Sequence, residues 1–144
     1  MGNMIEHNEP VTEELAIAEE TNTLANSSAM TFEQRKSALN SLTNFQSIWD
    51  LLDTASEVTV NVVNVLEMPI EQTDKRTGEV YNATRCIFVG EDGAAFATAS
   101  KVVKNNADIM LAILGAPETW ESAVKCVFTK VKGKTGDYFI NLSF

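Results

Sequence analysis

The feature that most constrains the fold is a strand-like run that passes directly into a helix-like run between residues 94 and 115. Residues 94–99 are mostly alanine and read as a short strand, and Ser100 is a favoured N-cap residue. Gly115 suits the position just after a helix, and Pro117 follows it. Five apolar residues between them share one helical face: Val103, Ala107, Met110, Leu111 and Leu114. The sequence therefore predicts a strand followed by a half-buried helix over 101–114.

Two strand-like runs precede this unit. Residues 57–67 are rich in β-branched side chains, and their alternation slips at Val62-Val63. This slip predicts a bulge where the strand bends between two halves of a barrel. Residues 79–89 form the second run, after a predicted loop from Met68 to Gly78 with a polar, partly basic tip. A tight turn rich in Gly then leads to the strand at 94.

Two more strands follow the helix, at residues 123–132 and 138–144, joined by a compact basic hairpin loop at 133–137. The complete order is strand, strand, strand, helix, strand, strand. This is the order of the OB-fold, a five-stranded Greek-key barrel with its helix between the third and fourth strands. We therefore predict a mainly β protein with helices: a five-stranded OB-fold barrel over residues 55–144 with a helical N-terminal extension.

The extension is predicted to contain a tail and a helix. Residues 1–29 are rich in Glu, Asn, Thr and Ser and lack aromatic residues, so we expect a flexible acidic tail. Residues 30–54 are expected to form an amphipathic helix, which begins with a capping box at Thr31 and Gln34 and continues to residue 53. Its apolar stripe consists of Ala38, Leu42, Phe45, Trp49 and Leu52. The stripe packs on the barrel or on a second copy of itself, and we favour packing within the chain.

Charge distribution decides whether a nucleic-acid partner is compatible with this chain. The chain has 20 acidic and 11 basic residues, a net charge of −9, which at first argues against such a partner. However, residues 1–36 hold seven Glu against Arg35 and Lys36, so −5 of that charge lies there. From Lys125 to Lys134 the only charged residues are four lysines. Because salt screens charges beyond about 8–10 Å, the local sign matters more than the total.

Several classes of protein are disfavoured. No apolar run approaches the roughly 20 residues of a membrane span, and the N-terminus lacks a signal-peptide pattern, so we expect a cytoplasmic protein with no membrane partner. Cys86 and Cys126 lie inside strands without metal-ligand spacing, which favours buried reduced thiols. His7 is the single histidine, and no Gly-rich phosphate loop precedes a helix. We therefore predict that the protein is not an enzyme and binds no cofactor and no metal.

Three sequence features together point to a known family. They are the run Phe-Ala-Thr-Ala-Ser-Lys-Val from Phe96, the run Leu-Gly-Ala-Pro-Glu-Thr-Trp from Leu114, and the lysine-rich hairpin that ends in aliphatic residues. Over residues 57–144 the chain resembles the single-stranded DNA-binding proteins of small bacteriophages and related mobile elements, notably those with protein-primed replication. The resemblance implies a protein that coats and protects single-stranded DNA during phage-type DNA replication, largely independently of sequence. Replication proteins are further candidate partners, and the 31–53 helix is a candidate for self-association.

Binding a single strand without sequence preference requires aromatic planes for the bases and cations for the phosphates. OB-folds bind oligonucleotides on the face of strands two and three and on two flanking loops. In the second strand Tyr81 and Arg85 share one face. We expect that face to point outward, so that Tyr81 stacks on a base and Arg85 pairs with phosphate or lies flat on a base. The alternative for Tyr81 is packing in the core or at its rim.

In the last strand, Phe139 lies on the face opposite Ile140 and Leu142. If those two residues are core, Phe139 points outward and is a candidate stacking plane, whereas its alternative is packing under the N-terminal helix. A residue of this type is, taken alone, more often a solvated surface charge, but the candidate phosphate contacts converge on the two flanking loops: Lys75, Arg76, Lys130, Lys132 and Lys134.

Two other kinds of function compete with DNA binding. The first is a protein-interaction module, an acidic OB-fold that docks on a host or replication protein through the helix face of Leu42, Phe45 and Trp49. The second is oligosaccharide binding, which is less favoured because the flanking loops are cationic and a secretion signal is lacking.

Overall fold

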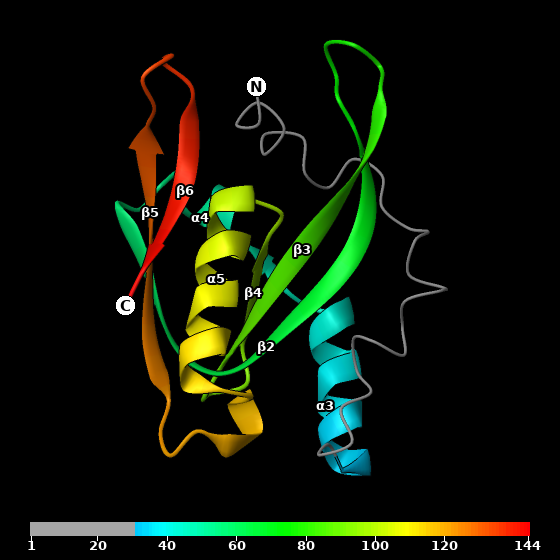
Figure 1. The fold of residues 1–144 in the computed structure, drawn as a ribbon, viewed down its shortest axis with the longest axis vertical. Coiled ribbons are helices and arrows are strands. Elements are labelled where there is room, and N and C mark those ends of the chain that lie inside the picture. The colour runs from blue at the N-terminus through cyan, green and yellow to red at the C-terminus, as the bar shows by residue number, and fades with distance from the viewer. Residues whose placement is uncertain (1–30) are drawn as a thin grey trace.

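A six-stranded sheet with helices on both of its faces makes up the protein (Figure 1). The computed structural model describes residues 31–144. The elements, in chain order, are α3 (Phe32–Thr43), β1 (Gln46–Ser47), α4 (Ile48–Leu51), β2 (Glu57–Thr73), β3 (Val80–Gly90), β4 (Ala95–Thr98), α5 (Lys101–Leu114), the 3₁₀ helix η1 (Pro117–Thr119), β5 (Val124–Lys132) and β6 (Tyr138–Ser143). The acidic tail predicted for residues 1–29 lies outside the described residues.

The sheet is a curled half-barrel and is open. Its strand order is β1-β4-β3-β2-β5-β6, antiparallel throughout except for the parallel pair of β1 and β4. The predicted mainly β class is confirmed, and β2-β3-β4-α5-β5-β6 has the predicted order. The prediction of a five-stranded barrel needs correction, because the sheet has six strands and β4 and β6 do not pair. From α5, the Asn106 side-chain amide donates to the Leu142 carbonyl at 2.9 Å, so the helix satisfies part of the β6 edge.

The predicted bulge in the first long strand is confirmed. Residues 57–62 of β2 pair with β5, residues 64–73 pair with β3, and the register shifts between Val62 and Asn64. Val62 itself faces both Val124 and Gly90. The bulge therefore marks the point where β2 leaves one half of the sheet and enters the other.

The predicted loop from Met68 to Gly78 is too long. In the structure β2 continues to Thr73, and the turn occupies only residues 74–79. Pro69 lies within the observed strand although it cannot donate a ladder hydrogen bond. It is tolerated because β2 pairs with β3 alone in this region, which leaves one edge of the strand free of ladder bonds. Burial of Met68 and Ile70 on one face supplies the alternating pattern of a strand.

The single helix predicted over residues 31–53 is interrupted. The capping box at Thr31 and Gln34 is present, but α3 ends at Thr43. The Thr43 hydroxyl donates to the Leu39 carbonyl at 3.0 Å, and the Asn44 amide donates to the Asn40 side chain at 3.1 Å. Such local bonds compete with the helical ladder, and the backbone becomes extended at the C-cap. The chain then forms β1 before α4 begins.

The apolar stripe packs within the chain, as favoured, but in two places. Leu42 and Phe45 pack on the outer face of the sheet, whereas Trp49 and Leu52 enter the main core. The face proposed for docking a protein partner, made by Leu42, Phe45 and Trp49, is therefore divided between two clusters. Trp49 is only 8 % exposed, so this face is not available as one contact surface.

The main core lies between the concave face of the sheet and α5. Phe88 and Phe128 meet edge to face there, with ring centroids 4.9 Å apart. The limits of α5 match the prediction, because the Ser100 hydroxyl accepts from the Val103 amide and Gly115 ends the helix at a φ of 84°. Cys86 and Cys126 are buried free thiols, as predicted. Within residues 31–144, the helices are too short or too polar to cross a membrane.

Candidate nucleic-acid interface

The two basic hairpin turns project at the same end of the molecule (Figure 1). The β2–β3 turn carries Lys75 and Arg76, and the β5–β6 hairpin carries Lys132 and Lys134. All four side chains are exposed. In the first turn the Asp74 carboxylate accepts from the Arg76 amide at 2.8 Å, which shapes the backbone beneath the cations. The structure thus brings four of the five predicted phosphate contacts to one end.

Tyr81 lies near the tip of the β2–β3 hairpin and is half-buried. Its hydroxyl donates to the side-chain carbonyl of Gln72 at 2.7 Å, and these two residues are directly opposite in the strand pair. The hydrogen bond fixes the orientation of the ring on the outer face of the hairpin.

Arg85 has the expected outward orientation, but its side chain is covered. Its side chain is only 2 % exposed, and the guanidinium lies 4.8 Å from the centre of the Phe45 ring. Alternation along β3 does place Arg85 on the outer face of the sheet, together with Ile87. However, α3 and the segment that follows it cover this part of the face through Leu42 and Phe45. The arginine is therefore a packing partner in a cation–π contact.

Phe139 lies on the outer face of the β5–β6 hairpin, as predicted. Its neighbours Ile140 and Leu142 are buried, at 0 % and 2 % exposed, whereas Phe139 is half-buried opposite Val131. The clusters that contain Leu42 and Phe45 are built with residues of the β2–β4 region. Among the described residues, Phe139 is not part of these clusters.

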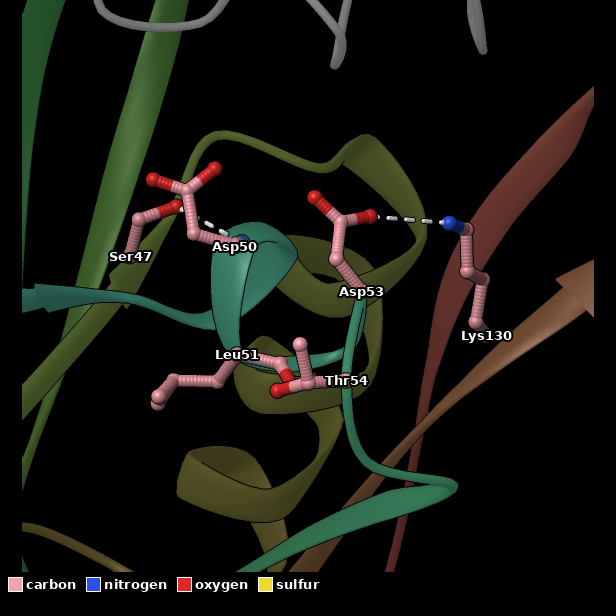
Figure 2. Close-up of polar contacts among 6 residues, drawn as sticks. All are labelled: Ser47, Asp50, Leu51, Asp53, Thr54 and Lys130. Carbon is pink, nitrogen blue, oxygen red and sulfur yellow. Dashed lines mark hydrogen bonds and ion pairs between the residues drawn. The ribbon is translucent and has the colours of Figure 1, made fainter.

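Lys130 is held by intramolecular contacts. Its ammonium lies 3.2 Å from an Asp53 carboxylate oxygen (Figure 2). It also lies 4.7 Å and 5.2 Å from the ring centres of Trp49 and Tyr138. These three partners were missed by sequence reasoning. Alternation could have indicated only the face of the strand: Lys130 is opposite the core residue Ile140, which places it on the inner face, toward the helices.

A second charged cluster joins β2 to α5. The Lys104 ammonium lies 2.6 Å from Asp108 and 3.8 Å from Glu67. Burial, followed by the hydrogen bond with Asp108 and the charge of Asp108, raises the pKa of Glu67 to about 7. The hydrogen bond with Glu67 lowers the pKa of Asp108 below its usual value. Burial raises the pKa of the neighbouring Cys86 thiol, so this cysteine stays protonated.

A sequence model for the Phi29-type family described as Phage Single-stranded DNA-binding protein matches residues 18–144. The chain belongs to this family. Neither the curated proteins nor the solved structures contain a significant match to the chain. The family match confirms the resemblance stated from the sequence, and it identifies single-stranded DNA as the partner and phage DNA replication as the process.

The two hairpins can be compared with what binding of single-stranded DNA requires. This family is defined by DNA binding and not by catalysis. A phage single-stranded DNA-binding protein requires cations along the path of the backbone and aromatic planes for bases. The described residues supply exposed cations at both hairpin turns and partly exposed aromatic rings at Tyr81, Tyr138 and Phe139.

Proposed function

We propose that the protein coats and protects single-stranded DNA during phage replication in the host cytoplasm, largely without sequence preference. The observation that carries the proposal is that both cationic hairpins project at one end of the open half-barrel (Figure 1), in a chain of the phage single-stranded DNA-binding family. Tyr81 and Phe139 are the proposed stacking planes. The proposed phosphate contacts are Lys75, Arg76, Lys130, Lys132 and Lys134. Arg85 leaves the proposed contact set because Phe45 covers it.

We assign the sheet to the OB type as part of this proposal. The order of the elements after α4 and the strand that bends at residue 62 support the assignment, although β4 and β6 do not pair. In this assignment the β2–β3 and β5–β6 turns are the two loops that flank an OB binding face.

Replication proteins and further copies of the chain are additional proposed partners. Two large apolar side chains of α3 are exposed and support a role of this helix in self-association: Phe32 at 73 % and Leu39 at 61 %. An exposed apolar pair on one helix is a small contact, so it fits association along a DNA strand better than a stable free dimer.

Titration of the full chain with fluorescently labelled oligo-dT at about 50 mM and 200 mM salt tests the proposal. We expect binding that weakens as salt rises, because phosphate contacts release counterions from the strand. Replacing Tyr81 and Phe139 by Ala should each weaken binding about fivefold or more, since one stacked base contributes about 1–3 kcal/mol. Binding to a random-sequence strand should be similar to binding of oligo-dT. Lack of binding, or binding that salt does not affect, would contradict the proposal.

A further inference from the structure

Lys130 is surrounded by side chains from three separate segments. Trp49 belongs to α4, Asp53 follows α4, and Tyr138 begins β6. Figure 2 shows the Asp53 carboxylate and the Lys130 ammonium reaching toward each other across the space between the α4 turn and β5. The ammonium is thus placed between two aromatic rings and one carboxylate.

The partners of Lys130 differ in how firmly they are held. Trp49 is 8 % exposed and belongs to the main core, so its position is fixed by packing. The Asp53 side chain is 55 % exposed and the Lys130 side chain 27 %. An ion pair exposed to this degree changes an equilibrium by about fivefold at most. Another oxygen anion can therefore replace the Asp53 carboxylate without disturbing the rings.

Tyr138 offers an aromatic surface beside that cation. It is 40 % exposed, which makes it more accessible than the half-buried Phe139. It is directly opposite Lys132, so a second exposed cation lies on the same face of the hairpin. A base stacked on Tyr138 would bring its own backbone phosphate close to these two lysines.

We propose that Lys130 and Tyr138 form a nucleotide site for single-stranded DNA, in which a backbone phosphate replaces the Asp53 carboxylate on Lys130 and a base stacks on Tyr138. This inference rests on the proposed function. It adds that Asp53, a carboxylate of the chain itself, competes with a DNA phosphate for Lys130. Asp53 holds the lysine between Trp49 and Tyr138 when DNA is absent, and it weakens DNA binding because it must be displaced. The site lies on the inner face of the β5–β6 hairpin.

Competition of Asp53 with DNA for Lys130 is tested with Asp53→Asn and a matched control, Asp50→Asn. Both changes raise the net charge by one and lie close together on α4 and its following turn, but in the described structure Asp50 forms no ion pair with Lys130. We expect Asp53→Asn to bind labelled oligo-dT about two- to fivefold more tightly than Asp50→Asn at about 50 mM salt. Equal affinities of the two variants would overturn the role of Asp53.

The phosphate contact is tested with Lys130→Gln in the wild-type and Asp53→Asn backgrounds. Loss of one phosphate contact should make the slope of log affinity against log salt shallower by about 0.7. The advantage of Asp53→Asn should disappear when Lys130 is replaced, since no cation is then left to release. An unchanged slope, or an advantage that persists without Lys130, would refute the site.

The stacking plane is tested with Tyr138→Ala, which should weaken binding about fivefold or more. Tyr138→Phe keeps the ring and should recover most of that loss. Thermal unfolding of each variant, followed by circular dichroism, shows whether it is folded. If the wild-type protein does not bind oligo-dT, the proposed function fails. If it binds but these variants behave like their controls, only the present inference fails.

Discussion

The environment of Glu67 disfavours the ionised form of its side chain. Its carboxylate lies between β2 and α5, and one of its oxygens is buried without a hydrogen-bond partner among the described residues. Burial, the hydrogen bond with Asp108 and the charge of Asp108 together raise its pKa from 4.5 to about 7, against the opposing effect of Lys104. Since the folded pKa exceeds the unfolded one, the folded state binds this proton more tightly. The protonated side chain of Glu67 is therefore tolerated at low pH. As pH rises from about 4.5 through 7, its ionisation lowers the free energy of unfolding.

Glu67→Gln should consequently increase the free energy of unfolding by about 1–2 kcal/mol at pH 8 and change it little at pH 5. Urea unfolding at the two pH values measures the difference. Glu71→Gln is the matched control, because Glu71 lies on the same face of β2 and is exposed. If the stability gained by Glu67→Gln were the same at both pH values, a shifted titration of Glu67 would not be its cause.

At the scale of elements, α3 and the segment after it act as a cover for the outer face of β3. Ala38 is buried there, Leu42 and Phe45 pack against the same cluster, and Arg85 is enclosed beneath the Phe45 ring. The ring stabilises the enclosed guanidinium through the cation–π contact. The cover therefore stabilises the sheet through both apolar area and the cation–π contact.

Phe45→Ala should lower the free energy of unfolding by about 1–3 kcal/mol, the range for a partly buried aromatic side chain with a cation–π contact. Phe32→Ala is the control on the same cover, because Phe32 is 73 % exposed, and it should change stability by less than about 0.5 kcal/mol. Urea unfolding of both variants measures the difference. If both variants lost a similar free energy of unfolding, packing of Phe45 over Arg85 would not be a specific source of stability.

Elements with local signals could be predicted from the sequence, and contacts between distant segments could not. The caps at Ser100 and Gly115 set the limits of α5, and the slip at Val62 marked the bulge, because each depends on neighbouring residues. The break after Thr43 was hidden because the apolar periodicity continues into α4, although Trp49 enters a different cluster from Leu42.

The same distinction applies to the candidate site. The exposed lysines of the hairpin turns were correctly placed, since turn residues are usually solvated. The covering of Arg85 by Phe45 depends on how α3 folds back over the sheet. The contact of Lys130 with Asp53 joins residues 77 positions apart, and alternation along a strand carries no information about such a partner.

For the whole molecule, the position of the charges matters more than their sum. The net charge is −9, yet exposed cations occupy both hairpin turns at one end, while β5 begins at the opposite end near Lys125 (Figure 1). Because charges interact over a Debye length of about 8–10 Å, a DNA strand that reaches this end comes within range of these exposed cations.

Replacing the basic residues of either hairpin turn by Gln should therefore reduce the salt dependence of DNA binding. The pairs Lys75→Gln with Arg76→Gln, and Lys132→Gln with Lys134→Gln, should each make the slope of log affinity against log salt shallower by about 1.4, since each removes two phosphate contacts. Lys125→Gln, at the other end, is the control and should leave the slope unchanged. Binding of labelled oligo-dT over a range of salt concentrations provides the slopes. A hairpin pair that behaves like the control would lie outside the DNA path.

The bend in β2 has a consequence for cooperativity of unfolding. One continuous strand pairs with β5 before Val62 and with β3 after Asn64, so both halves of the sheet share a single backbone. If either hairpin separated, it would leave part of β2 with unpaired donors and acceptors and would open the main core shared by Val60 and Val65. We therefore expect the two arms that carry the cations to unfold together in a single transition.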